Sequence, residues 1–118
     1  MSARLLASML LICSAAAAVP WNSAPQPVNG SYQMYGGELD DMKPPTGKDR
    51  KVSFMFSGPL AREMFDSIGP DLKAACSDAP DYRERRRADL SCTRYRGEYR
   101  CYVGLNIVSG KSTVGSIC

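Results

Sequence analysis

Residues 51–57 alternate between apolar and polar side chains, which is the pattern of a β-strand with one buried face. Val52, Phe54 and Phe56 fall on the apolar face, and the two serines of the segment fall on the other. Because Phe54 occupies the middle of the apolar face, we expect it to lie beneath the element that covers this strand.

A helix is predicted immediately after the strand. Gly58-Pro59 begins it, because proline is tolerated in the first turn of a helix. Gly69-Pro70 ends it, because glycine suits a helix C-terminus and proline cannot continue the helix. Between these points, apolar residues recur every four positions and form a stripe that can pack on a sheet. The stripe consists of Leu60, Met64 and Ile68, flanked by Ala61 and Phe65.

The last third of the chain is rich in strand-forming residues. Strands are predicted over residues 89–95 and 98–108, joined by a two-residue Arg-Gly turn at positions 96 and 97. A last strand is predicted over residues 111–118, after a Ser-Gly turn at positions 109 and 110.

The remaining segments complete the outline. A first strand is expected over residues 31–39 and a loop over residues 40–50, while a short helical turn over 71–76 and a loop over 77–82 follow the main helix. The order of strand, helix and strand meander predicts an α+β fold. We expect a small disulfide-stapled domain with one main helix packed on an antiparallel sheet and a C-terminal β-meander.

The N-terminal residues have the three-part pattern of a cleavable export signal. Arg4 precedes a short apolar run, and small residues follow that run. Ala16 and Ala18 suit the small pockets of a signal peptidase, which predicts cleavage after Ala18. The apolar run is far shorter than the roughly 20 residues that cross a bilayer. Lipid anchoring at Cys13 is not expected, because Ile12 is too bulky for the position before a lipidated cysteine.

Cleavage divides the chain into three parts. Residues 1–18 are the signal peptide, residues 19–31 a flexible Pro-rich leader, and residues 32–118 a single α+β domain. The expected location is the periplasm or the extracellular space. The succession of an apolar strand, a helix and a Cys-containing hairpin over roughly residues 51–105 resembles small exported bacterial proteins of unknown function, and this resemblance assigns no site residues.

Four cysteines remain after cleavage, and an even number in a short exported domain predicts two disulfides. Counting outward from the Arg-Gly turn places Cys92 opposite Cys101, at a non-hydrogen-bonded pair where a cross-strand disulfide is allowed. This count favours the pairing Cys92–Cys101 with Cys76–Cys118. Counting from the Ser-Gly turn places Cys118 opposite Cys101, so Cys76–Cys92 with Cys101–Cys118 remains the alternative.

The composition argues against catalysis and metal binding. The chain has no histidine, which removes the commonest general base and metal ligand. The cysteines lack the paired C-x-x-C spacing of a zinc site, and the acidic run at residues 38–41 lacks the spacing of a calcium loop. We therefore expect no enzymatic activity, no cofactor and no metal. The net charge of +3, or +2 without Arg4, is too small to indicate a nucleic acid partner by itself.

Arginine and tyrosine concentrate in one region. Residues 83–100 contain seven Arg against three acidic residues, a local net charge of +4, with tyrosines interleaved. Alternation along the hairpin places Tyr95, Arg100 and Tyr102 on the face opposite the cysteines. Tyr and Arg dominate the energetics of protein interfaces, which makes this region a candidate binding surface. Its candidate residues are Arg85, Arg86, Arg87, Tyr95, Arg96, Arg100 and Tyr102. The competing interpretation is a solvated basic loop beside an ordinary exposed strand face.

The predicted function is an exported binding module that recognises or inhibits another protein, such as an envelope enzyme or a toxin. The alternative is a protein that binds lipopolysaccharide, nucleic acid or another acidic polymer through the Arg cluster at 83–100. Salt separates the two, because polyanion binding weakens steeply as ionic strength rises.

Overall fold

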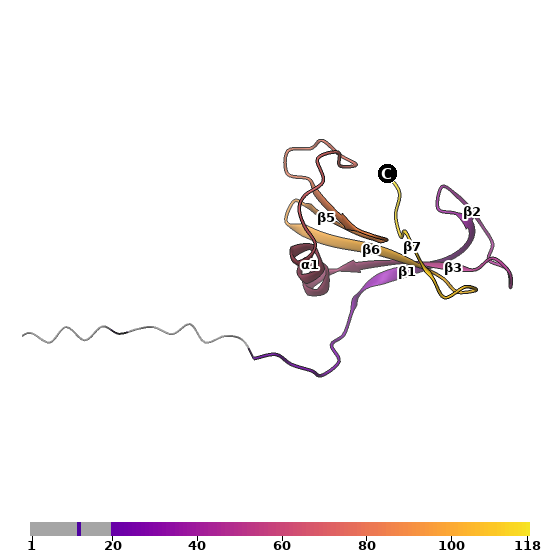
Figure 1. Ribbon diagram of the computed structural model, residues 1–118, viewed down its shortest axis with the longest axis horizontal. Helices are drawn as coiled ribbons and strands as arrows, with labels where there is room; N and C mark the ends of the chain where they lie inside the picture. The colour runs from indigo at the N-terminus through magenta and orange to yellow at the C-terminus, as the bar shows by residue number, and fades with distance from the viewer. Residues whose placement is uncertain (1–11, 13–19) are drawn as a thin grey trace, which may run out of the picture.

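The computed structural model describes Ile12 and residues 20–118, so the predictions on signal cleavage and on Cys13 lie outside the described residues. One helix packs on an antiparallel sheet stapled by two disulfides, which confirms the predicted α+β class (Figure 1). In this described part, no helix has the length and apolar character needed to cross a bilayer. The elements are β1 (Asn29–Glu38), β2 (Asp41–Lys43), β3 (Lys51–Ser57), α1 (Gly58–Ser67), β4 (Arg83–Arg87), β5 (Leu90–Tyr95), β6 (Glu98–Asn106) and β7 (Ser112–Thr113).

The strands lie in the order β2-β1-β3-β6-β5-β4, with β7 beside β6. The long strands β3 and β6 form the centre of the sheet and pair along the full length of β3, from Lys51 with Asn106 to Ser57 with Arg100. The predicted positions of β3, α1, β5 and β6 are confirmed. Figure 1 shows α1 on one side of the sheet and the C-terminus on the other.

The core lies between α1 and the strands β3, β5 and β6. Ala61, Phe65 and Ile68 are buried from the helix side, against the fully buried Cys92 and Cys101 of the sheet. The buried stripe of the helix therefore centres on Ala61 and Phe65. Leu60 and Met64, which the sequence predicted to lie on the centre of the stripe, are only half-buried.

The β5–β6 hairpin has the predicted register. Arg96 and Gly97 both have positive φ (51° and 77°), the conformation of a two-residue turn whose twist matches that of the strands. This turn places Cys92 opposite Cys101 with a Cα–Cα distance of 4.0 Å, and the two form a disulfide.

The second turn differs from its prediction. Asn106 closes a longer loop, because its side-chain oxygen accepts hydrogen bonds from the backbone N–H groups of Val108 (3.0 Å) and Ser109 (3.1 Å). The short β7 then pairs with Gly104 and Leu105, two positions out of the predicted register. Cys118 consequently does not lie opposite Cys101, and it forms a disulfide with Cys76. The structure thus contains the favoured pairing, Cys92–Cys101 with Cys76–Cys118.

Residues 71–76 form no helical turn, contrary to the prediction. The side chain of Asp71 is engaged by Arg83 and Arg85, and the N–H of Leu72 donates to the carbonyl oxygen of Glu84 (2.8 Å). These contacts hold the segment against the outer edge of β4. The basic stretch predicted as a loop or exposed face is this edge strand.

Three smaller expectations at the N-terminal end also change. Strand β1 starts at Asn29, inside the predicted leader, and β2 lies within the predicted loop over residues 40–50. Phe54 is on the predicted face of β3, but Phe56 is the residue that packs against the core under α1. Phe54 stacks beside Phe56 instead, with ring centroids 5.9 Å apart, because the ten-residue helix covers only part of the sheet.

Candidate binding site

A cavity of about 320 Å³ lies on the face of the sheet opposite α1, and we call it the tyrosine cavity. Because side chains alternate along a strand, residues next to the core cysteines in sequence point into it. Its lining residues come from the segment before β4, from β4, β5 and β6, and from the C-terminal tail: Cys76, Tyr82, Glu84, Thr93, Tyr95, Glu98, Arg100, Tyr102, Ser116 and Ile117.

Tyrosine rings form much of the wall. The rings of Tyr82 and Tyr95 have centroids 6.2 Å apart, and Tyr102 lines the cavity from the neighbouring strand. Burial, together with a hydrogen bond to Glu84, raises the pKa of Tyr82 to about 12. Tyr82 therefore keeps its proton and acts as a hydrogen-bond donor at neutral pH.

Glu84 is the most buried charged side chain of the cavity, with 4% of its surface exposed. Its Oε1 accepts a hydrogen bond from the Tyr82 hydroxyl (3.0 Å). Within the described part of the chain, no Lys or Arg nitrogen approaches its carboxylate within 4.0 Å. The sulfurs of Cys76 and Cys118 lie within 4.8 Å of it, but they are joined in a disulfide and offer no thiolate to a metal.

The C-terminal tail closes one side of the cavity and is held at three points. The first is Gly115, which approaches β6 so closely that a Cβ on it would lie 2.5 Å from the backbone nitrogen of Val103. The second is a hydrogen bond between the hydroxyls of Ser116 and Ser91 (3.0 Å). The third is the disulfide that ties down Cys118. The cavity wall is therefore fixed before any ligand arrives.

The structure places three of the seven candidate binding residues in the cavity. Tyr95, Arg100 and Tyr102 line the cavity, as the alternation predicted. Arg86 is exposed on the same face of β4, since it pairs with Ser91 two positions beyond Glu84. Arg96 occupies the hairpin turn, with its guanidinium carbon 5.0 Å from the centre of the Tyr95 ring.

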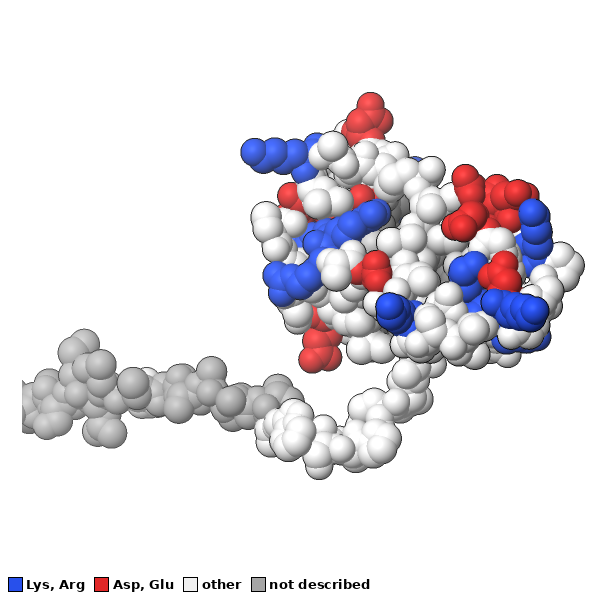
Figure 2. Space-filling model, turned by 45° about the vertical axis from the view of Figure 1, so that its right-hand side comes forward, with Lys and Arg blue, Asp and Glu red and all other residues white. Residues whose placement is uncertain are grey.

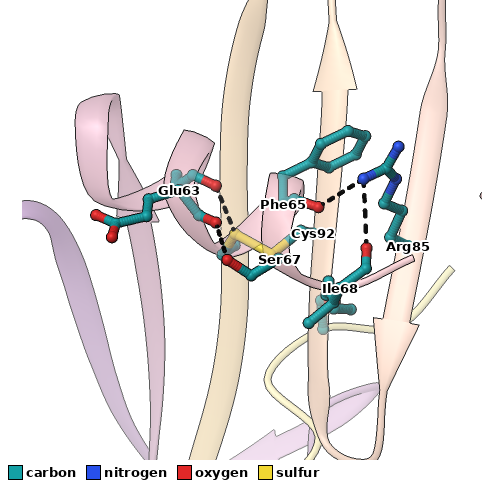
Figure 3. The surroundings of a disulfide bond; sticks show 10 residues. Glu63, Phe65, Ser67, Ile68, Arg85 and Cys92 are labelled. Carbon is teal, nitrogen blue, oxygen red and sulfur yellow. Dashed lines mark hydrogen bonds between the residues drawn. A yellow bond between two sulfur atoms is a disulfide. The ribbon is translucent and has the colours of Figure 1, made fainter. Parts of the chain in front are cut away.

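Arg85 and Arg87 fall on the other face of β4, toward α1. Arg85 stacks over the Phe65 ring at 4.2 Å and donates to the carbonyl oxygens of Phe65 (2.8 Å) and Ile68 (3.5 Å) at the end of the helix (Figure 3). Its Nε also donates to Asp71 (2.7 Å). Arg85 therefore serves the fold and is not free for a partner, whereas Arg87 is exposed near the strand end.

Asp71 joins two arginines of the cluster. Arg83 and Arg85 both donate to its carboxylate, and these hydrogen bonds, that from Arg83 first, lower the pKa of Asp71 below its ordinary value. Figure 2 shows blue and red side chains interspersed on the face in view, without a continuous basic patch. Asp71 and Glu98 offset part of the positive charge of the cluster, because they pair with Arg83, Arg85 and Arg100.

Sequence reasoning missed Glu84 as a site residue, together with Thr93 and the tail residues. A usable signal was present: if residues 83–87 are taken as a strand paired with β5, Glu84 falls opposite Thr93 on the face of the tyrosines. The position of Ser116 and Ile117 depends on the Cys76–Cys118 disulfide, which the sequence favoured without excluding the alternative pairing.

The fold and site define a small disulfide-stapled α+β domain with a preformed tyrosine-lined cavity opposite its helix. Comparison with protein-family models, with curated proteins and with solved structures finds no significant match to this chain.

Proposed function

We propose that this protein is an exported module that binds another protein through the tyrosine cavity. The observation that carries the proposal is the convergence of three tyrosines, a buried carboxylate and Arg100 on one cavity. Tyr and Arg supply most of the binding energy in protein interfaces, and cavities that bind ligands combine apolar walls with a few oriented polar groups.

The scaffold supports a binding role in a second way. Strands β4, β5 and β6, the Cys76–Cys118 disulfide and the pinned tail hold the cavity in one shape. A preformed site loses little conformational entropy when it binds, so more of the contact energy appears as affinity. The disulfides favour an oxidising compartment, which supports the proposed export through the signal predicted at residues 1–18.

The polyanion alternative has less support. Arg83 and Arg85 are paired with Asp71, and Arg100 lies 3.6 Å from a carboxylate oxygen of Glu98. Arginines that are neutralised within the fold contribute less to a field that attracts an acidic polymer.

A capture experiment with matched tyrosine variants tests the proposal. The exported protein, its Tyr102→Ala variant and its Tyr32→Ala variant are used as bait in extract of the exporting host, and captured proteins are quantified by mass spectrometry. Tyr32 is the control, because it is 71% exposed and lies on the helix side of the sheet, outside the tyrosine cavity. We expect a partner that wild type and Tyr32→Ala retain and Tyr102→Ala loses. Equal retention by all three would contradict the proposal.

A further inference from the structure

We propose that the tyrosine cavity receives a cationic side chain, the ammonium of a lysine or the guanidinium of an arginine, with Glu84 as its counter-ion. This inference rests on the proposed function, since a protein partner supplies the cation. It names the chemistry that the cavity recognises.

The first argument is the charge balance of Glu84. A buried carboxylate is expected to have a cationic partner or several hydrogen bonds, because desolvation of an unpaired charge is expensive. Glu84 is 4% exposed, yet only the Tyr82 hydroxyl donates to its side chain among the described residues. A carboxylate accepts about four hydrogen bonds. Neither oxygen of Glu84 is a fully buried atom without a partner, because among the described residues Thr113 Oγ1 is the one such atom, so the remaining acceptor sites of Glu84 open toward the cavity. An ammonium or guanidinium supplies the missing donors and the missing charge together.

The second argument is the aromatic wall. A cation within about 6 Å of the centre of a tyrosine ring is attracted by the electrons of its face. The protein already uses this contact at the rim, where Arg96 lies over Tyr95. Tyr82, just before β4, and Tyr102, in β6, line the cavity together with Glu84. Aromatic rings around a carboxylate are a combination that selects cations over neutral groups of the same length.

Two positive groups at the site oppose a bound cation and provide a directional test. Arg100 lines the cavity and lies 3.6 Å from Glu98, whose charge offsets its own. Arg86 is exposed on the same face of β4. Both oppose an incoming cation through their charge. This gives a directional test, because replacing Arg100 should strengthen binding of a cation and weaken binding of an anion.

The test is a titration of the isotope-labelled exported protein, followed by NMR. The probes are the N-acetyl methylamides of lysine and arginine, with that of norleucine as the neutral control of matched length and putrescine as a free amine. We expect saturable shifts at Thr93, Tyr102 and Ser116 with the two cationic amino acids and none with norleucine. Glu84→Gln, which keeps the shape and the bond from Tyr82, should bind at least about tenfold more weakly, because a charge-assisted contact is lost. Arg100→Ser should bind more tightly than wild type.

Three results would overturn the inference: equal binding of norleucine, binding of putrescine alone, or unchanged affinity in Glu84→Gln. If Glu84→Gln does not fold, Tyr102→Ala, in a half-buried wall position, tests the aromatic wall instead, and unchanged affinity for the lysine probe in that variant would also overturn the inference. The inference and the proposed function fail separately. If a captured partner loses binding to Tyr102→Ala but still binds Glu84→Gln, the cation site alone is refuted. If the cavity binds the lysine probe but the captured partner binds Tyr102→Ala as well as wild type, the proposed role of the cavity in partner binding is refuted.

Discussion

The hydroxyl of Tyr82 donates a 3.0 Å hydrogen bond to the carboxylate of Glu84, which is almost fully buried opposite the helix. The bond orients the carboxylate within the tyrosine cavity and keeps one of its oxygens occupied. The other side of the same strand is equally specialised, since Arg85 packs on Phe65 beneath α1. Strand β4 thus contributes a charged residue to each face of the sheet, for different purposes.

The raised pKa of Tyr82 predicts a loss of stability in alkali. The folded state holds the phenol proton more tightly than the unfolded chain, because the pKa is about 12 against an ordinary 10.0. This contribution is complete below pH 10 and disappears as the pH rises toward 12. Tyr82→Phe removes it, so wild type should lose more stability than Tyr82→Phe across this window. Parallel curves from denaturant unfolding at a series of pH values would show that folding does not raise the pKa of Tyr82.

Asp71 should contribute to stability through its two arginines. We expect Asp71→Asn to cost about 1 kcal/mol, the upper range for partly exposed pairs, because Arg83 and Arg85 lose their common acceptor beside Phe65. Asp66→Asn is the control, since its exposed pair with Arg62 has a distance of 3.9 Å.

The pH dependence of Asp71 has a defined sign. Its pKa is lowered on folding from 3.8, so its contribution is present above that pH and is lost as the pH falls through the folded value. The unfolding curves of wild type and Asp71→Asn should therefore converge in acid. A difference between them that persists in strong acid would exclude the ion pair as its cause.

Two phenylalanines on the helix side should differ in their effect on stability. Phe65 is 1% exposed in the core, so Phe65→Ala should cost about 3–5 kcal/mol. Phe54 is half-buried beyond the end of α1, so Phe54→Ala should cost only about 1–2 kcal/mol. Urea unfolding of both variants measures the difference. Equal costs would mean that the helix covers more of the sheet than described.

Removing the Cys76–Cys118 disulfide should disrupt the tyrosine cavity while the core stays folded. The bridge closes a loop with a sequence separation of 42, which corresponds to about 4 kcal/mol in the chain-entropy model. We expect the Cys76→Ser/Cys118→Ser variant to keep the resonances of Cys92 and Cys101 in the core near their native positions. Its signals at Ser116 and Tyr102 should shift widely. A variant that unfolds altogether would show that the tail stabilises the whole domain.

The sequence predicts those elements of the fold that carry a local sequence signal. The Arg-Gly turn sets the β5–β6 register and so the pairing of Cys92 with Cys101. Gly58-Pro59 begins α1 as predicted. Strand β4 has no apolar alternation, because its core-facing side chain is the stacked guanidinium of Arg85, so periodicity could not reveal it.

The candidate site was predictable only in part, for the same reason. The hairpin alternation identifies Tyr95, Arg100 and Tyr102, which follow from one local turn. Glu84 requires that β4 be recognised first. Predicting the position of the C-terminal tail requires the long-range disulfide of Cys118. Counting residues outward from the two predicted turns left two possible partners for this cysteine.

The affinity of the captured partner for purified tyrosine variants tests the central claim most directly. Isothermal titration with wild type, Tyr102→Ala and Tyr32→Ala should show a loss of about tenfold or more for Tyr102→Ala, as for an interface residue at a central cavity. Tyr32→Ala should bind within about twofold of wild type, because Tyr32 is exposed on the helix side of the sheet and does not line the tyrosine cavity. Equal affinity of Tyr102→Ala and wild type, with both proteins folded, would contradict the assignment of the tyrosine cavity as the binding site.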